Sequence, residues 1–217
     1  MEQLILIFEI VGVISFALSG AMTALRRQMD IFGVCVLGLT TACGGGIIRD
    51  LILGQTPPAA FRDPLSVSLA VAVSVVVFIP AVRRLLYHNL RAYELLLLWA
   101  DSVGLGIFAV SGVRVAIEAG YASNRFLTVF VGVLTGVGGG VLRDMFAGDR
   151  PYIFVKHVYA CAALLGALVC DLLWQPMGRY AAMLAGFAVV LVMRLCSAHF
   201  RWSLPHAQQL EEEKNAS

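Results

Sequence analysis

The motif Gly-Gly-Gly-x-x-Arg-Asp occurs twice in this chain of 217 residues. The residues of its two copies are Gly44, Gly45, Gly46, Arg49 and Asp50, and Gly138, Gly139, Gly140, Arg143 and Asp144. Each glycine costs a helix about 1 kcal/mol relative to alanine, so a kink or break is expected where three occur together. Carbonyl groups freed at such a break can coordinate a cation, and the arginine and aspartate that follow carry both signs of charge. The motif therefore indicates a site for a small cation or a zwitterion.

Three further pairs of polar residues accompany the motifs at nearly constant spacing. They are Thr41 with Thr135, Glu9 with Asp101, and Ser19 with Ser111. The threonines precede the glycines by about one helical turn, so their hydroxyl groups can add oxygen ligands. An acidic residue inside an apolar segment is a functional candidate by default, because a charge in lipid is costly. We therefore include all six among the candidate pore residues.

The composition places these residues in a membrane protein. Hydrophobic residues make up 59% of the chain and charged residues 14%, and the mean hydropathy is +0.84. Soluble domains average roughly 45–50% apolar and about 25% charged residues, so an ordinary soluble domain is excluded. A net charge of +2 with dispersed basic residues does not indicate nucleic-acid binding. The cysteines and histidines show neither CxxC nor HExxH spacing, so we expect no metal site and no cofactor.

A helix that crosses a bilayer needs about 20 mostly apolar residues, and we count seven apolar segments that approach or exceed this length. Their approximate bounds are Leu4–Leu25, Ile31–Leu53, Pro64–Val82, Tyr93–Ile117, Phe126–Ala147, Tyr152–Trp174 and Gly178–Met193. We predict an all-α membrane protein with a single transmembrane domain over residues 1–198 and a polar cytoplasmic tail over residues 199–217.

The first six segments form an internal repeat. A shift of 94 residues superimposes the two motifs without a gap, and a shift of 92 superimposes the segments that precede them. Repeat one covers about residues 4–86 and repeat two about residues 93–174, followed by a seventh helix at about residues 178–198. Three spans per repeat force the two copies into opposite orientations, which places the working site near the middle of the membrane. We thus predict two inverted three-helix repeats plus one extra helix, with kinked second and fifth helices.

Lysine and arginine are unevenly distributed between the two sides of the predicted domain. The side of the amino terminus has 5 and the opposite side has 11. Because loops rich in these residues stay in the cytoplasm, we expect an external amino terminus and a cytoplasmic carboxyl terminus. Arg49 and Arg143 lie near membrane depth and need partners. Pairing of Arg49 with Asp144, and of Arg143 with Asp50, would fit the two-fold symmetry of the repeats, since neighbours on a helix do not face each other.

The chain resembles the bacterial branch of the trimeric intracellular cation (TRIC) channel family over roughly residues 4–198. The resemblance is carried by the doubled motif, by Phe16-Ala17-Leu18-Ser19-Gly20-Ala21 and by Phe108-Ala109-Val110-Ser111-Gly112. It implies a homotrimer in the lipids of the bacterial inner membrane, in which each subunit has its own pore for monovalent cations, principally potassium. The glycine triplets correspond to the kink glycines of that family. The same branch includes members described as glycine transporters.

Two transport functions are therefore considered. In a channel, carbonyl, hydroxyl and carboxylate oxygens replace part of the hydration of a potassium ion. In the alternative, a secondary transporter for a small amino acid such as glycine, the Arg-Asp pairs bind the two charged groups of the zwitterion. An enzyme is disfavoured, because the hydrolase motif Gly-x-Ser-x-Gly is absent and no histidine lies in the motif-bearing helices. For the channel, a bulky residue at Gly139 is expected to reduce conductance without removing the folded protein. Glycines also allow membrane helices to pack closely, but the repeated Arg-Asp pair favours a functional role over packing alone.

Overall fold

The computed structural model describes residues 2–155, 158–200 and 202, and all regular structure in this part of the chain is helical. In chain order the helices are α1 (Glu2–Arg26), α2 (Ile31–Ile52), α3 (Ala59–Arg62), α4 (Leu65–Phe78), α5 (Pro80–Tyr87), α6 (Leu90–Ala116), the π-helical turn η1 (Ile117–Tyr121), α7 (Arg125–Phe146), α8 (Tyr152–Val155) and α9 (Tyr159–Phe200). Residues 201 and 203–217 of the predicted tail lie outside the described residues.

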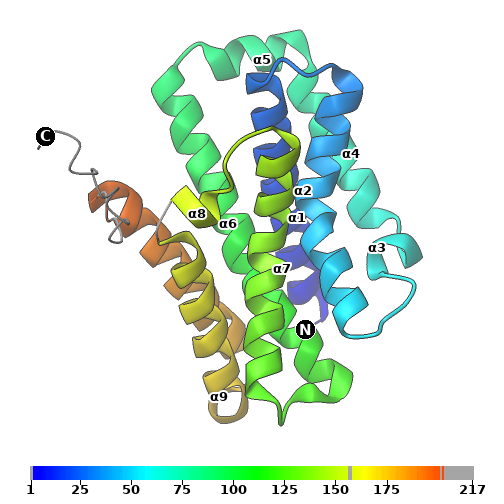
Figure 1. Ribbon diagram of the computed structural model, residues 1–217, viewed down its shortest axis with the longest axis vertical. Coiled ribbons are helices and arrows are strands. Elements are labelled where there is room, and N and C mark those ends of the chain that lie inside the picture. The colour runs from blue at the N-terminus through cyan, green and yellow to red at the C-terminus, as the bar shows by residue number, and fades with distance from the viewer. Residues whose placement is uncertain (1, 156–157, 201, 203–217) are drawn as a thin grey trace, which may run out of the picture.

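The last long helix, α9, consists of two antiparallel arms (Figure 1). Gly178 has φ 77° and ψ 165°, a conformation that glycine reaches at little cost, and it separates residues 159–177 from residues 179–200. The arms are the sixth and seventh predicted spans. The sixth begins at Tyr159 and not at Tyr152, because Tyr152 belongs to the separate turn α8.

The third predicted span is not one straight helix. α4 has 14 residues and α5 has 8, and the two are bent by 71° at Ile79. The bend follows from Pro80, because a proline disfavours the helical conformation of the residue before it; Ile79 has φ −55° and ψ 131°. α4 is only about 21 Å long, shorter than the hydrocarbon core of about 30 Å. α5 lies across the end of the bundle (Figure 1).

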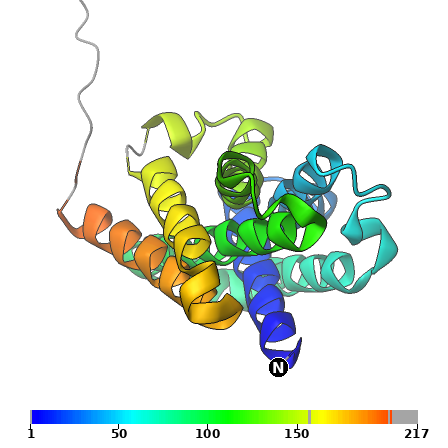
Figure 2. The same ribbon diagram turned by 90° about the horizontal axis from the view of Figure 1, so that it is seen from below.

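The two repeats are visible in the packing of the helices. α1, α2 and α4 contact one another, as do α6, α7 and α9, and the two sets run in opposite directions (Figure 1). The sets meet where α1 contacts α6 and α2 contacts α7. Viewed from below, α4 and α9 flank these central helices on opposite sides (Figure 2). The prediction of an all-α membrane fold with inverted three-helix repeats and one extra helix is confirmed.

The ends of α2 and α7 repeat as closely as the helices themselves. Asp30 and Asn124 cap the two amino-terminal ends by accepting backbone hydrogen bonds of 2.7 Å and 3.1 Å. Gly54 and Gly148 follow the carboxyl-terminal ends with φ of 69° and 71°, a left-handed conformation that favours glycine. Both pairs are separated by the shift of 94 residues found in the motif.

α2 and α7 cross at their glycine triplets. A Cβ atom on Gly45 would collide with the carbonyl oxygen of Thr135, and one on Gly139 would collide with that of Thr41. Both helices continue through the triplet without a non-helical residue, so neither helix breaks within residues 31–52 or 125–146, and the kink expected at each triplet remains a prediction. The continuous helices keep the backbone hydrogen-bonded at membrane depth, and the glycines allow the two backbones to touch.

Candidate functional site

A polar cavity of about 160 Å³ opens on the side of the bundle where the amino terminus lies. Its polar lining consists of Glu9, Arg49, Asp50, Asp63, Ser66 and Ser111, and we call it the N-side cavity. Apolar residues of α1, α2, α3 and α6, among them Val13 and Phe108, complete the wall. Three carboxylates oppose one guanidinium in the lining, and Arg114, which does not line the cavity, pairs with Glu9, so the net formal charge with this partner included is −1. Such a lining attracts cations.

The arginine and aspartate of the first motif, Arg49 and Asp50, form an ion pair with each other. Nε and Nη2 of Arg49 each lie 2.8 Å from Oδ1 of Asp50. Oδ2 of Asp50 accepts a hydrogen bond of 2.7 Å from the backbone N–H of Ala59. The aspartate is 1% exposed and the arginine 11% exposed. The pair therefore ties the end of α2 to the start of α3 and neutralises the arginine within the N-side cavity.

The second Arg-Asp pair has the same geometry. Nε and Nη2 of Arg143 each lie 2.8 Å from Oδ1 of Asp144, whose Oδ2 accepts from the backbone N–H of Tyr152 at 2.8 Å. The predicted crossed pairing between the repeats is therefore wrong. An arginine side chain is long enough to fold back along the last turn of its helix and reach the carboxylate of the next residue.

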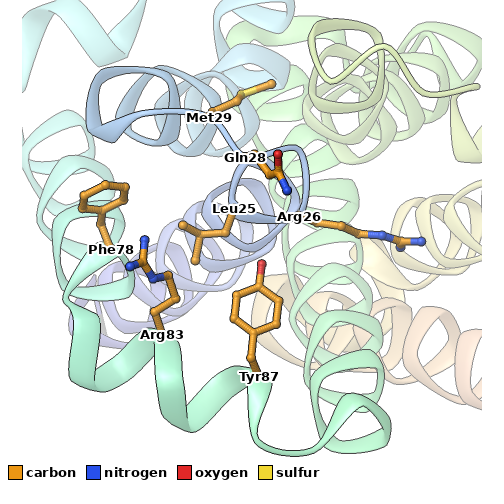
Figure 3. Close-up of a pocket in the computed structure, with 7 residues that line it drawn as sticks. All are labelled: Leu25, Arg26, Gln28, Met29, Phe78, Arg83 and Tyr87. Atoms are coloured by element: carbon orange, nitrogen blue, oxygen red, sulfur yellow. The ribbon is translucent and has the colours of Figure 1, made fainter.

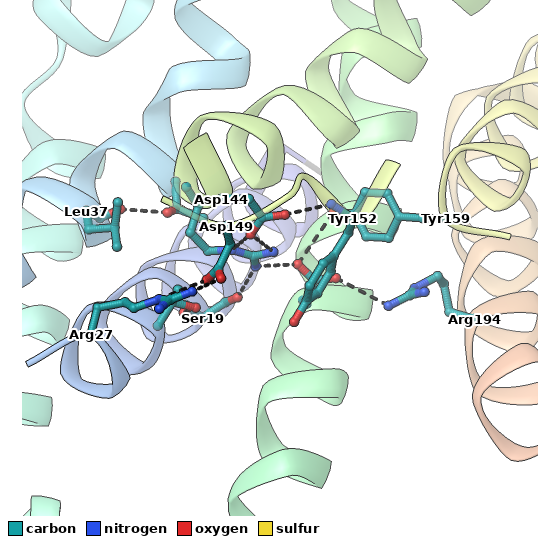
Figure 4. Close-up of polar contacts among 12 residues, drawn as sticks. Ser19, Arg27, Leu37, Asp144, Asp149, Tyr152, Tyr159 and Arg194 are labelled. Atoms are coloured by element: carbon teal, nitrogen blue, oxygen red, sulfur yellow. Dashed lines mark hydrogen bonds and ion pairs between the residues drawn. The ribbon is translucent and has the colours of Figure 1, made fainter. Parts of the chain in front are cut away.

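Arg143 also belongs to a buried charge cluster at the opposite end of the site from the N-side cavity (Figure 4). We define the cluster as Asp101, Arg143, Asp144, Tyr159 and Arg194. Nη1 of Arg143 lies 2.6 Å from Oδ1 of Asp101, and Nη2 of Arg194 lies 3.4 Å from Oδ2 of the same carboxylate. The side chains of these three residues are at most 3% exposed. Two positive and two negative charges cancel in the cluster.

Aromatic and hydroxyl groups close the space around the cluster. Nη1 of Arg143 donates a hydrogen bond of 2.5 Å to Oγ of Ser19, and the hydroxyl of Tyr159 lies 3.4 Å from Oδ1 of Asp101. The guanidinium of Arg143 lies 4.9 Å from the ring centroid of Tyr152. The guanidinium of Arg194 stacks over Tyr159 at 4.7 Å. These contacts leave the cluster sealed.

The two ends of the site therefore differ although their motifs are alike. Arg143 binds the serine of α1 and the acid of α6. The repeat assigns Ser111 and Glu9 as the corresponding partners of Arg49, but Oε1 of Glu9 instead accepts a hydrogen bond of 2.5 Å from Arg114. One end holds an interlocked ion network, and the other leaves a cavity.

The two threonines lie between these ends but do not line the N-side cavity. Thr41 and Thr135 are buried, and their hydroxyls donate to the carbonyl oxygens of Leu37 and Val131 at 2.6 Å each. They sit where α2 meets α1 and where α7 meets α6, against glycines that permit this approach. The structure thus places them at helix contacts.

Comparison with known proteins gives consistent matches over nearly the whole chain. A sequence profile described as "Glycine transporter" matches residues 6–81 and 98–175. The UPF0126 inner membrane protein YadS of Escherichia coli is 35% identical over 199 residues, which cover 91% of this chain and 93% of that protein. A structure that addresses conductance through TRIC cation channels has a TM-score of 0.81 and 35% identity, covering 94% of this chain and 97% of that chain. The chain belongs to the TRIC channel family.

A TRIC channel orthologue from Rhodobacter sphaeroides is a further structural match. Its TM-score is 0.82 at 34% identity, and the match covers 92% of this chain and 99% of that chain. The family resemblance found in the doubled motif is therefore confirmed at the level of the whole fold.

Three residues of this TRIC family member contact the site although the sequence does not predict a role for them there: Arg114, Tyr159 and Arg194. From the sequence, both arginines are expected to contribute to the charge of the loops. In the structure they lie within helices, 14% and 3% exposed, and Arg194 is internal because α9 continues to Phe200, past the predicted end of the seventh span at Met193. None of the three belongs to the motif. One sequence signal could have indicated that Arg114 and Arg194 are internal. Each lies within a turn or two of the end of an apolar segment, and an acidic residue lies in a segment that packs beside it.

Proposed function

We propose that the chain forms a channel for monovalent cations, principally potassium, with one path per subunit at the interface of the inverted repeats. The observation that supports it is the N-side cavity, whose lining has three carboxylates, one neutralised guanidinium and two hydroxyl groups. Carboxylate and hydroxyl oxygens can replace part of the hydration shell of an ion that passes through. The cavity is lined by α1, α2, α3 and the start of α4 from the first repeat and by α6 from the second, so both repeats contribute to it.

The path is closed at its other end in this conformation. The cluster around Arg143 fills the space between α1, α6, α7 and α9 with paired charges and two tyrosine rings. Removal of charges from water is costly, so a network of this kind persists only while its partners stay together. Opening then requires that Arg143 leave Asp101 or Ser19. The open cavity and the sealed cluster together support a closed state of the proposed channel, accessible from one side.

The orientation and assembly follow from separate arguments. Excluding the four arginines whose side chains are at most 14% exposed and paired with acids inside the bundle, Arg49, Arg114, Arg143 and Arg194, leaves three basic residues on the side of the amino terminus and nine on the other. This favours an external N-side cavity and a cytoplasmic charge cluster. The matched structures are of trimeric channels, and we propose a homotrimer here. Mass measurement of the detergent-solubilised protein is expected to give three subunits; a monomer or dimer would contradict this.

Transport of glycine is the second candidate, favoured by the description of the matching profile. The N-side cavity offers a guanidinium for a carboxylate group, and acids for an ammonium group, within about 160 Å³. A zwitterion bound there would be released on the other side after Arg143 had moved. A glycine transporter would use the same residues as the channel. It would differ from the channel because opening would be coupled to the binding of glycine.

Purified protein in planar bilayers with a potassium gradient separates the two functions. For the channel, we expect discrete unitary currents that reverse near the potassium equilibrium potential and do not change when glycine is added to one side. Silent bilayers, together with saturable glycine uptake by proteoliposomes, would reject the channel and make the Arg49–Asp50 pair the substrate site.

A further inference from the structure

A second cavity lies at the end of the bundle away from the amino terminus, between the α1–α2 turn and the bent helices α4 and α5 (Figure 3). Its volume is about 480 Å³. Its polar lining consists of Arg26, Gln28, Arg83 and Tyr87, and its apolar lining includes Leu25 and Phe78. We call it the α5 cavity. It has no residue in common with the N-side cavity or the charge cluster.

The polar lining of the α5 cavity consists of hydrogen-bond donors and positive charges, with no carboxylate among its side chains. Within the described residues, neither Arg26 nor Arg83 forms an ion pair. The adjacent Arg27, in contrast, pairs with Asp149. Arg83 reaches back from α5 over the ring of Phe78, 5.7 Å from its centroid, so its charge is held at the cavity (Figure 3). The chemistry fits an anion with several acceptor oxygens.

Gln28 occupies a position where glycine would be the less strained choice. The backbone N–H groups of Gln28 and Met29 donate to the carbonyl oxygens of Leu25 and Ala24 at 3.0 Å and 3.1 Å, which is the Schellman arrangement of a helix end. The residue at this position must be left-handed, and Gln28 has φ 57°. A left-handed conformation is unfavourable for a residue with a Cβ atom. The side-chain amide of Gln28, which a glycine at this position would lack, lines the α5 cavity.

The α5 cavity lies where lipid headgroups meet the protein. α5 turns by 71° from α4 and runs across the end of the bundle, with arginines beside exposed apolar side chains such as Leu85, which is 75% exposed. This is the pattern of a helix in the membrane interface. On α4 and at the bend, Val76 and Ile79 expose an apolar surface beside the cavity on which acyl chains can lie. Basic pockets between helices at this depth suit anionic headgroups.

We infer that the α5 cavity binds the phosphate headgroup of an anionic phospholipid. Arg83 provides the charge within the cavity and Arg26 adds a second positive charge at its edge, Gln28 and Tyr87 provide hydrogen bonds to the phosphate oxygens, and the acyl chains lie along α4. The inference depends on the membrane location of the chain and not on the channel function.

The test is native mass spectrometry of the full-length protein in detergent, titrated with phosphatidylglycerol or with phosphatidylcholine of the same acyl chains. The wild type is expected to retain phosphatidylglycerol preferentially. Arg83→Gln should weaken this binding about fivefold, the effect of one basic residue at a membrane surface. Gln28→Gly should also weaken it while leaving the melting temperature unchanged or higher, because the backbone strain is removed.

Arg91→Gln is the matched control, since Arg91 is an exposed arginine at the start of α6 that does not line the cavity. It removes the same charge from an equally exposed position and should change the affinity less than about twofold, because Arg91 lies outside the cavity lining and does not contact the headgroup. Equal losses in Arg83→Gln and Arg91→Gln would overturn the inference in favour of general surface attraction. Equal retention of the two lipids by the wild type would also overturn it, as would full competition by inorganic phosphate, which would identify a free anion as the ligand.

Discussion

Gly139→Ala is expected to lower the stability of the protein more than any other single methyl addition in the α7 triplet. The added Cβ would collide with the carbonyl oxygen of Thr41, which belongs to the backbone of α2 and cannot rotate away. The two helices must separate, and overpacking of this kind costs about 1–3 kcal/mol. For a chain of this size we expect a decrease of roughly 2–12 °C in the melting temperature, measured by tryptophan fluorescence in detergent.

Gly46→Ala is the matched control. A Cβ atom there would meet nothing closer than Arg49 at 3.7 Å, so the methyl group can be accommodated. Because alanine favours helix by about 1 kcal/mol over glycine, the melting temperature should stay constant or rise. Equal losses of stability in both variants would refute the close contact of α2 and α7 at Gly139. The earlier expectation that a bulky residue at Gly139 leaves the protein folded does not survive this geometry, because the glycine faces a neighbouring backbone.

The fold could be predicted because its signals are periodic and repeated. Apolar segments of membrane length, the shift of 94 residues and the odd number of spans per repeat determine the inverted plan without knowledge of any contact. The bend at Ile79 was foreseeable too, since Pro80 lies inside the predicted third span. The missing break at the triplets was not. Three glycines lower the helix propensity of an isolated segment, which is why the sequence predicts a break there. In the folded protein the packing of a second helix against the glycines determines whether the helix breaks or continues.

The difference between the two ends of the site could not be read from the motif, because both copies have the same residues. It is produced by side chains outside the motif. Arg194 and Tyr159 come from α9, and Arg194 lies in the helix that has no counterpart in the other repeat. Arg114, which holds Glu9, corresponds to Met22 under the shift of 92 residues. Which acid an arginine pairs with depends on the position of its guanidinium in the folded protein. The spacing of residues along the sequence does not give that position.

Arg143→Gln is expected to increase potassium flux several-fold in proteoliposomes. The substitution removes the guanidinium that joins Asp101, Asp144 and Ser19, so the sealed end loses its central group. The cluster changes from neutral to a formal charge of −1, which favours cations. The same change should lower stability by about 3–5 kcal/mol, because two buried carboxylates lose a partner. Flux is therefore normalised to the folded protein recovered in the liposomes.

Arg49→Gln is the control that the inverted repeat provides. It removes an arginine with the same local geometry, but at the end of the site that is already open to the N-side cavity. Because Arg49 does not belong to the charge cluster, its replacement should change the potassium flux much less than Arg143→Gln does. The loss of stability should also be smaller, because the side chain of Arg49 is 11% exposed and that of Arg143 is 1% exposed. Arg143→Lys keeps the charge with a shorter reach, so an intermediate flux is expected. An unchanged flux in folded Arg143→Gln, or an equal increase in Arg49→Gln, would mean that the charge cluster is not the closed end of the path, and the asymmetry of the two repeats would then be structural only.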